Sequence, residues 1–457
     1  MLKALTLSEI AAPLGGRLLG ADAQFAAVCT DSRQIVPGQL FIALSGPNFD
    51  GHDYLADVAA KGAVAALVER AVANCQLPQL LVADTRLALG QLGALNRQAY
   101  QGPLVAITGS SGKTTVKEML ASILRAGLGG EVLATRGNLN NDLGAPLTLL
   151  ELGAQHVAAV IELGANHLGE IAYTVGLTRP QVAILNNAGS AHVGEFGGPE
   201  KIVEAKGEII DGLAADGVAV LNRDDKAFGI WQQRAGGRKV LSFALRNPAA
   251  DFSARDIQQD ARGCPAFTLQ GLAGEARIQL NLLGEHNVAN ALAACAAAHA
   301  LQVPLVGIRQ GLESLQPVKG RGVARLAASG MRVIDDTYNA NPVSMCAAVD
   351  ILAAFSGRTV LVLGDMGELG EWAEQGHREV GEYAAGKVSA LYAVGPLMRH
   401  AVAAFGGSGR HFADQASLID ALTEEQGPST TLLIKGSRSA AMDKVVAALC
   451  ATTEESH

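Results

Sequence analysis

Apolar runs alternate with amphipathic stretches along most of the chain, a pattern typical of an α/β protein. From Pro103 onward, the runs PLVAIT, AAVIEL, QVAILN and GVAVLN are separated by loops and by stretches with helical periodicity. Continuous apolar runs indicate strands buried on both faces, as in a mainly parallel sheet covered by helices. We therefore predict a central doubly wound domain, with a helix starting at Lys113 after the first of these strands.

The same pattern divides the chain into three predicted domains. Residues 1–83 mix short apolar runs with the turn-forming segment GPNFDGHD, which predicts a small α/β domain. Residues 84–315 hold the parallel sheet, then paired strands over 251–283 and a helix over 287–300. In residues 316–457, the runs MRVIDD, RTVLVLGDM, SALYAVG and TLLIKG each precede a helical stretch, which predicts a second, Rossmann-like doubly wound domain. A length of 457 residues agrees with about three domains.

Composition narrows the class of protein. A hydrophobic fraction of 49% with 18% charged residues excludes extended disorder, and a net charge of -8 gives no overall attraction for nucleic acid or anionic membranes. The first residues make a poor signal peptide, and no apolar run approaches the roughly 18 residues of a membrane span. Six scattered cysteines without C-x-x-C spacing indicate reduced core thiols. We expect a soluble cytoplasmic protein that binds no nucleic acid and does not insert into membranes.

The segment TGSSGKTT at 108–115 carries the most specific chemistry. A buried strand leads into a Gly- and Ser-rich turn and then a helix, so free N–H groups can surround phosphate oxygens. Lys113 would neutralise phosphate charge, and Thr114 can bind Mg²⁺. The alternative is an ordinary strand-to-helix turn, and the strict G-x-x-x-x-G-K-[ST] pattern is not met because Ile107 holds the place of its first glycine. The expected nucleotide-binding residues are Gly109, Ser110, Ser111, Gly112, Lys113, Thr114 and Thr115.

Two further residues follow predicted strands. Glu162 ends the run AAVIE, where ligands bind in doubly wound sheets, and a carboxylate beside a nucleotide is a usual partner of Mg²⁺. His192 lies in the loop after QVAILN. The alternatives are a solvated strand-end carboxylate and a structural loop histidine.

Lys206 is anomalous in its own segment. If PEKIVEAKGEII is helical, its apolar face holds Lys206 in the middle of Ile202, Val203, Ile209 and Ile210. We place Glu200, Glu204, Glu208 and Asp211 on a different side. An amine in an apolar face must snorkel, pair with an acid or be chemically altered.

Polar residues near the second domain boundary suit a nucleotide. The amides of Asn287 and Asn290, at a helix start, can read an adenine edge, although an asparagine cap is the alternative. Arg321 has a planar guanidinium that can bind phosphate; the alternative is a solvated side chain in a linker.

Asp336 ends the strand MRVIDD, and Asn339 and Asn341 precede a helix. GDMGELG and the cation-rich segment KGSRSAAM follow two later strands; the second suits a carboxylate, and either could be only a capped turn.

These segments resemble those of the Mur ligases, ATP-dependent enzymes of peptidoglycan synthesis, over nearly the whole chain. The ordered matches are TDSR, GQLFIAL, TGSSGKTT, GNLNNDLG, ELGANHLGEI, AHVGEFG, AKGEI, GEHNVANALAA, DDTYNANPVSM, GDMGELG and KGSRSAAM. The YNANP, GDMGELG and KGSRSAAM segments favour the family member that adds D-Ala-D-Ala to UDP-N-acetylmuramoyl-tripeptide. Glu285 departs from the basic or neutral residue expected before His-Asn.

The resemblance implies a set of roles. ATP phosphorylates the substrate carboxylate, and the amine of the dipeptide attacks the resulting acyl phosphate. Thr114 and Glu162 would hold one Mg²⁺, and His192 and a carbamylated Lys206 a second. Arg321 would bind phosphates, Asn287 and Asn290 the nucleotide, and Asp336 the ribose or a domain closure. The expected substrate contacts are Ser32 and Arg33 for the UDP end, Asn138 and Asn141 for the peptide, and Asn339, Asn341, Lys435, Ser437 and Arg438 for the dipeptide.

The resemblance leaves alternatives open. A relative that couples a single amino acid, such as another Mur ligase or a folylpolyglutamate synthetase, would share most of these motifs. A nucleotide-binding switch or kinase would share only the phosphate loop. We expect a monomer, and the third residue of the tripeptide, meso-diaminopimelate or L-lysine, stays undecided.

Overall fold

The computed structural model describes residues 1–188, 199–317, 319–320, 322–338, 340–367, 369–425 and 427–450. His192, Arg321 and Asn339 lie outside these described residues. The chain divides into two compact units. Unit 1 comprises Met1–Arg255, Leu269–Ala276 and Ala289–Leu312, and unit 2 comprises Asp256–Thr268, Arg277–Val288 and the chain from Glu313 onward.

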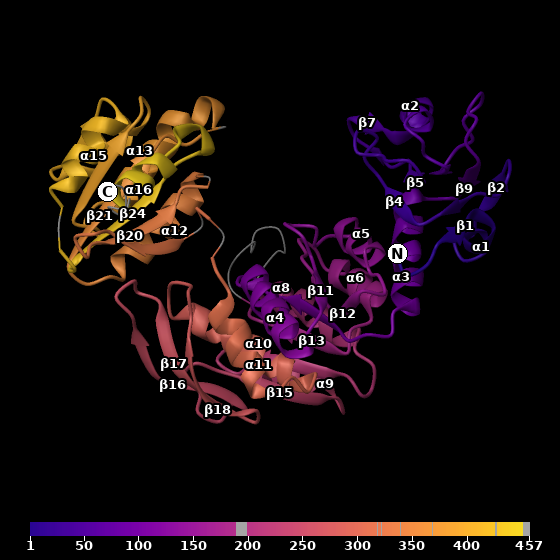
Figure 1. The fold of residues 1–457 in the computed structure, drawn as a ribbon, viewed down its shortest axis with the longest axis horizontal. Helices are drawn as coiled ribbons and strands as arrows, with labels where there is room; N and C mark the ends of the chain where they lie inside the picture. The colour runs from indigo at the N-terminus through magenta and orange to yellow at the C-terminus, as the bar shows by residue number, and fades with distance from the viewer. Residues whose placement is uncertain are drawn as a thin grey trace, which may run out of the picture. The chain divides into compact units, whose positions relative to one another are not determined.

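The N-terminal part of unit 1 is a small α/β domain, as its short apolar runs predict. Its five-stranded sheet has the order β2-β9-β8-β5-β4, parallel except for the pairing of β2 with β9. Two small antiparallel pairs, β1 with β3 and β6 with β7, accompany it. Figure 1 labels β2, β4, β5 and β9 of the five-stranded sheet. The elements are β1 (Leu5–Thr6), α1 (Leu7–Ala11), β2 (Arg17–Leu19), β3 (Gln24–Phe25), β4 (Ala27–Cys29), β5 (Gln39–Ile42), β6 (Ser45–Gly46), β7 (Phe49–Asp50), α2 (Leu55–Ala60), β8 (Ala65–Val68), β9 (Gln79–Leu81) and α3 (Thr85–Ala99).

The central sheet has the strand order β11-β12-β10-β13-β14-β15-β16-β17-β18, and its pairings from β11 through β15 are parallel. The predicted strands and the helix start at Lys113 are confirmed. Its strands are β10 (Leu104–Thr108), β11 (Glu131–Ala134), β12 (His156–Glu162), β13 (Val182–Leu185), β14 (Val218–Asn222), β15 (Lys239–Phe243), β16 (Phe252–Gln259), β17 (Pro265–Gly271) and β18 (Gly274–Gln279). Its helices are α4 (Lys113–Leu128), α5 (Gly144–Leu150), α6 (Glu170–Thr178), α8 (Pro199–Asp211), α9 (Phe228–Ala235), α10 (His286–Ala300) and α11 (Leu305–Ser314).

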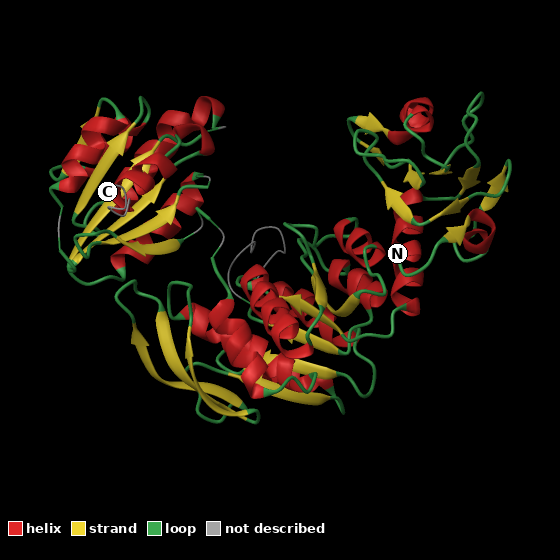
Figure 2. Cartoon of the chain, in the orientation of Figure 1, coloured by secondary structure: helices red, strands yellow, loops and turns green. Residues whose placement is uncertain are grey.

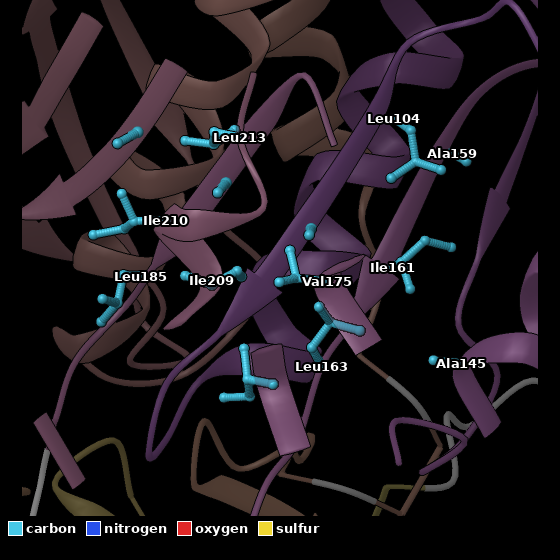
Figure 3. Close-up of a cluster of buried hydrophobic side chains, with 14 of the residues drawn as sticks. Leu104, Ala145, Ala159, Ile161, Leu163, Val175, Leu185, Ile209, Ile210 and Leu213 are labelled. Carbon is cyan, nitrogen blue, oxygen red and sulfur yellow. The ribbon is translucent and has the colours of Figure 1, made fainter. Parts of the chain in front are cut away.

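One face of this sheet packs against helices α6 and α8. Ile161 of β12 and Leu185 of β13 lie in one buried cluster with Val175 of α6 and Ile209 and Ile210 of α8 (Figure 3). Burying a branched aliphatic side chain stabilises a fold by about 1.5–3 kcal/mol. The cluster therefore holds β12 and β13 firmly, and with them the residues that leave their carboxyl ends.

Unit 2 contains a six-stranded sheet of order β19-β20-β24-β21-β22-β23, parallel except for the edge strand β19. Figure 2 draws its strands in yellow and its helices in red. The four predicted strands of the Rossmann-like domain are confirmed as β20, β21, β22 and β24. The elements are β19 (Val323–Leu326), β20 (Arg332–Asp336), α12 (Pro342–Ala353), β21 (Arg358–Gly364), α13 (Ala373–Ala384), β22 (Ala390–Val394), α14 (Met398–Phe405), β23 (Gly409–Phe412), α15 (Gln415–Thr423), β24 (Thr430–Lys435) and α16 (Asp443–Cys450).

The expectation of six core thiols is only partly right. All six cysteines are free, but only Cys264 and Cys295 are buried. The other four are partly exposed, although Cys29, Cys75 and Cys450 still pack against buried hydrophobic clusters. In the part of the chain that the structure describes, no helix combines the length and the apolar character needed to cross a bilayer.

Candidate active site

The site forms where three parallel strands end side by side. In the sheet register, Ile107 of β10 pairs with Glu162 of β12, and Thr108 pairs with Leu185 of β13. The phosphate loop after β10 therefore lies between the ends of β12 and β13. This is the edge of a parallel sheet at which doubly wound proteins bind ligands.

Two asparagines that directly follow β13 brace the phosphate loop. The backbone amide of Ser110 donates to the carbonyl oxygen of Asn187 at 3.0 Å, and that of Ser111 donates to Asn187 Oδ1 at 2.9 Å. Asn186 Nδ2 donates to the carbonyl oxygen of Ser111 at 3.0 Å. Sequence reasoning missed both asparagines because nothing local shows that β13 is the neighbour of β10.

Gly112 closes the loop in a conformation that requires glycine. Its φ is +76°, and a Cβ there would lie 2.5 Å from Asn186 Nδ2 and 2.5 Å from Asn290 Oδ1. Those two amide groups are hydrogen-bonded to each other at 3.0 Å. The loop therefore packs directly on an amide pair that joins β13 to α10.

Lys113 is the first residue of α4, and its ammonium lies inside the loop. Lys113 Nζ donates to the carbonyl oxygen of Gly109 at 2.8 Å. Burial lowers the pKa of Lys113, while the charge of Glu162 acts in the opposite direction. A desolvated cation at the start of a helix is suited to stabilise transferred phosphate oxygens.

Glu162 is only 2% exposed, and both oxygens of its carboxylate have partners. Oε2 accepts a hydrogen bond from Thr114 Oγ1 at 2.9 Å, and Oε1 accepts one from Asn140 Nδ2 at 2.9 Å. A carboxylate and a hydroxyl beside a phosphate loop form the set of hard oxygen donors that Mg²⁺ prefers. These residues therefore fit one such ion. Within the described ranges, no group of three or more His, Cys, Asp or Glu residues is arranged to hold a metal.

A cavity of about 170 Å³ opens beside these groups. Lys113 and Lys206 both line it, so two basic side chains face one small polar space. The complete lining is Gly109, Ser110, Lys113, Asn140, Asn141, Gly164, Ala165, Asn166, Glu170 and Lys206.

Lys206 lies in the middle of a buried helix face, as predicted. It is 4% exposed, while Ile202 and Ile209 on the same helix are fully buried. Lys206 Nζ lies 3.4 Å from the carbonyl oxygen of Ala165. Burial, and then the charge of Lys113, lower the pKa of Lys206 to about 8, although Glu170 and Glu208 act in the opposite direction. The neutral amine is therefore much more populated near pH 7 than in an ordinary lysine, although the ammonium form still predominates.

Glu208, which we place on a different side of α8 from Lys206, makes its contacts with the neighbouring helix α6. Its side chain is buried, and its carboxylate accepts the backbone amides of Gly169 at 2.7 Å and Ala172 at 2.9 Å. These N–H groups belong to the start of α6, where a helix favours negative charge. Glu208 thus caps a neighbouring helix, a partnership that periodicity along α8 cannot indicate.

The other predicted nucleotide residues serve internal contacts in the structure. Asn290 accepts from Asn186, and Asn287 Nδ2 donates to the carbonyl oxygen of Leu283 at 2.8 Å. The side chains of Asp336 and Lys435 form an ion pair at 2.7 Å, because the two residues are paired in register on β20 and β24. Burial raises the pKa of Asp336, and Lys435 opposes that shift.

The predicted substrate residues of unit 1 lie at exposed or partly buried positions. Asn138 and Asn141 are exposed in the loop after β11, where Asn141 Oδ1 accepts the amide of the first residue of α5. Arg33 is bonded through two nitrogens to Asp31 and lowers the pKa of that carboxyl to about 2. Ser32 is partly buried, and its carbonyl oxygen accepts from Lys61 Nζ at 2.9 Å.

In unit 2, Asn341 caps α12 by accepting the amide of Ser344 at 2.8 Å. Ser437 is buried, and its hydroxyl lies 3.0 Å from that of Ser439. Arg438 is exposed at the start of a short 3-10 helix.

A phosphate loop with a lysine, a hydroxyl and a buried carboxylate at the end of a parallel sheet defines a P-loop type of nucleotide-binding enzyme. Three family descriptions match the chain in order: Mur ligase family, catalytic domain, over residues 24–97; Mur ligase middle domain over 107–298; and Mur ligase, glutamate ligase domain, over 321–438. The chain belongs to the Mur ligase family.

Its relatives include one particular member of that family. The chain is 47% identical over 450 residues to the UDP-N-acetylmuramoyl-tripeptide–D-alanyl-D-alanine ligase of Escherichia coli (strain K12), covering 97% of this chain and 98% of the relative. A crystal structure of MurF from Acinetobacter baumannii is 40% identical, with a TM-score of 0.82 and coverage of 99% and 100%. MurF ligase from Thermotoga maritima in complex with ADP is 28% identical, with a TM-score of 0.72 and coverage of 93% and 96%.

Proposed function

We propose that this protein is the ATP-dependent ligase that adds D-alanyl-D-alanine to UDP-N-acetylmuramoyl-tripeptide, forming UDP-N-acetylmuramoyl-pentapeptide, ADP and phosphate. The observation that carries the proposal is identity to a ligase of that name along almost the full length of both chains. The cavity lined by the phosphate loop and Lys206 supports this proposal, because the carboxylate of a substrate and the phosphates of a nucleotide could meet in that polar space.

The chain's own residues account for the first step. The amides of Ser110 and Ser111 are taken up by Asn187, so the free backbone amides at the start of α4 and the ammonium of Lys113 would bind the β- and γ-phosphates. The substrate carboxylate attacks the γ-phosphorus, and ADP leaves as the acyl phosphate forms. Charge develops on the transferred oxygens, so positioning and cationic stabilisation matter more than acid–base chemistry. Thr114 and Glu162 would hold a Mg²⁺ ion, which neutralises phosphate charge when bound.

Lys206 would serve the second step and the second metal. Its depressed pKa provides the neutral amine that reacts with carbon dioxide, and carbamylation would turn the side chain into a carboxylate-like ligand. His192 would share that second Mg²⁺. The amine of D-Ala-D-Ala then attacks the acyl carbon, and the tetrahedral intermediate collapses to the amide as phosphate leaves.

The remaining assignments divide the substrates among three domains with boundaries at 83 and 315. Residues 1–83 bind the UDP end through Ser32 and Arg33, and Asn138 and Asn141 line the peptide path. The nucleotide contacts are Asn287, Asn290, Arg321 and Asp336, and the dipeptide contacts are Asn339, Asn341, Lys435, Ser437 and Arg438. The protein would act as a cytoplasmic monomer, without nucleic acid or membrane partners.

Phosphate release tests this proposal. Purified protein is given ATP, Mg²⁺ and UDP-N-acetylmuramoyl-tripeptide, with and without D-Ala-D-Ala, and the products are identified by mass spectrometry. Sustained release that requires the dipeptide and yields the pentapeptide is expected. Release with a single amino acid would favour another Mur ligase or a folylpolyglutamate synthetase, and release indifferent to any amine would favour a kinase or switch.

A further inference from the structure

Lys117 is a fully buried lysine outside the site described above. It lies on α4 one helical turn after Lys113 and is 1% exposed. Its Nζ donates to the carbonyl oxygen of Thr135 at 2.6 Å and lies 2.8 Å from a carboxylate oxygen of Glu118. An ammonium group is costly to bury unless it is paired and hydrogen-bonded. Its burial on α4, the helix that follows the phosphate loop, therefore calls for a reason.

That reason lies in how β11 leaves the sheet. The amide of Thr135 still donates to the carbonyl oxygen of Val160 on β12 at 3.1 Å. If the parallel ladder continued, the carbonyl of Thr135 would accept the amide of Glu162. Instead, that amide donates to the hydroxyl oxygen of Thr135 at 2.9 Å, and the carbonyl is bound by Lys117.

This exchange of partners turns the chain toward the nucleotide site. Beyond Thr135, the chain runs through residues 136–139 to Asn140, which holds the end of β12 with two groups. Its carbonyl oxygen accepts the amide of Gly164 at 2.8 Å, and its Nδ2 donates to Glu162 Oε1. Both ends of this segment thus act on Glu162, one through its backbone amide and one through its carboxylate.

We propose that Lys117 and Thr135 are positioning residues that set the orientation of the Glu162 carboxylate and so the affinity of the site for the metal–nucleotide complex. This inference rests on the proposed function only in that it takes Glu162 as the carboxylate that binds Mg²⁺ beside ATP. Lys117→Met removes the donor and keeps the chain length, so the Thr135 carbonyl loses its partner. Thr135→Val removes the hydroxyl at nearly constant shape, and Thr135→Ser retains it.

Equilibrium binding of ADP, measured by calorimetry with Mg²⁺ and separately with EDTA, tests the proposal without turnover. The affinity gained from Mg²⁺ should fall by about 10- to 100-fold in Lys117→Met and in Thr135→Val, the usual effect of losing a group that orients a metal ligand. Affinity in EDTA should stay at the wild-type value. Thr135→Ser should keep the wild-type gain, and so should Arg125→Met, an exposed position on the same helix.

An unchanged Mg²⁺ gain in both disruptive variants would overturn the proposal, and so would a parallel loss of affinity in EDTA, since that indicates a role in folding only. If Lys117→Met does not fold, the comparison of Thr135→Val with Thr135→Ser decides. Absence of a Mg²⁺ effect in the wild type would also refute the inference. Phosphate release that ignores the dipeptide would refute the ligase proposal alone.

Discussion

Substituting Gly112 by alanine should damage both the nucleotide site and the fold. The residue has a φ of +76°, and an added Cβ would lie 2.5 Å from the amide atoms of Asn186 and Asn290. A left-handed backbone costs an alanine about 1–2 kcal/mol. Overpacking costs about 1–3 kcal/mol, and loss of the bond between the two asparagines costs about 1 kcal/mol. The full strain is therefore about 3–6 kcal/mol.

The loop can escape this strain by moving off the amide pair, at the expense of phosphate binding. If only about 1.4 kcal/mol of the strain is transferred to binding, the affinity for ADP falls about tenfold. We therefore expect Gly112→Ala to weaken ADP binding by at least about tenfold, measured by calorimetry. Urea denaturation should show a loss of unfolding free energy below the full strain, because the displaced loop relieves part of it.

Gly129→Ala is the matched control. Gly129 ends the same helix with a φ of +69°, and nothing lies within 4 Å of an added Cβ. This variant should lose only the conformational cost of about 1–2 kcal/mol and bind ADP as the wild type does. Equal stability losses in the two variants, with ADP affinity intact in Gly112→Ala, would show that the close approach of the loop to the amides is not what requires glycine.

Three further outcomes follow from Lys206 and Arg97. Because the folded pKa of Lys206 is about 8 against 10.5 for an ordinary lysine, the unfolded chain binds more protons between these values. The unfolding free energy of the wild type should therefore rise with pH across that window relative to that of Lys206→Met, measured by urea denaturation in bicarbonate-free buffer. A difference between the two proteins that does not change with pH would contradict the burial of a charged amine. Lys206→Ala should lose ligase activity and recover part of it with small carboxylic acids in a phosphate-release assay, and wild-type turnover in the variant would refute a metal-binding role. Arg97→Met should lower the free energy of unfolding by about 3–5 kcal/mol in urea denaturation, because it leaves the carbonyl oxygens of Thr178, Tyr100 and Arg179 without their donor. A loss below about 1 kcal/mol would mean that water replaces the guanidinium.

Much of the site could be read from local sequence. Apolar runs of four to seven residues indicate strands because burial on both faces favours apolar side chains, so the position of Glu162 at a strand end could be predicted. The order of strand, glycines, lysine and helix within one short segment identified the phosphate loop. The periodicity of α8 placed Lys206 within an apolar face, and its burial is confirmed.

The tertiary structure decided which distant segments meet. Asn186, Asn187 and Asn140 look like ordinary loop asparagines, yet strand order places them on the phosphate loop and on Glu162. Glu208 has the spacing of a surface residue but caps α6.

By itself, the sequence determined the α/β class, the phosphate loop and the buried lysine of α8, because those features depend on residues close together in the chain. Only the tertiary structure revealed the exchange at Thr135 that frees a carbonyl for Lys117. That exchange depends on hydrogen bonds between β11, β12 and α4, and no periodicity within one segment records which partner a backbone group takes.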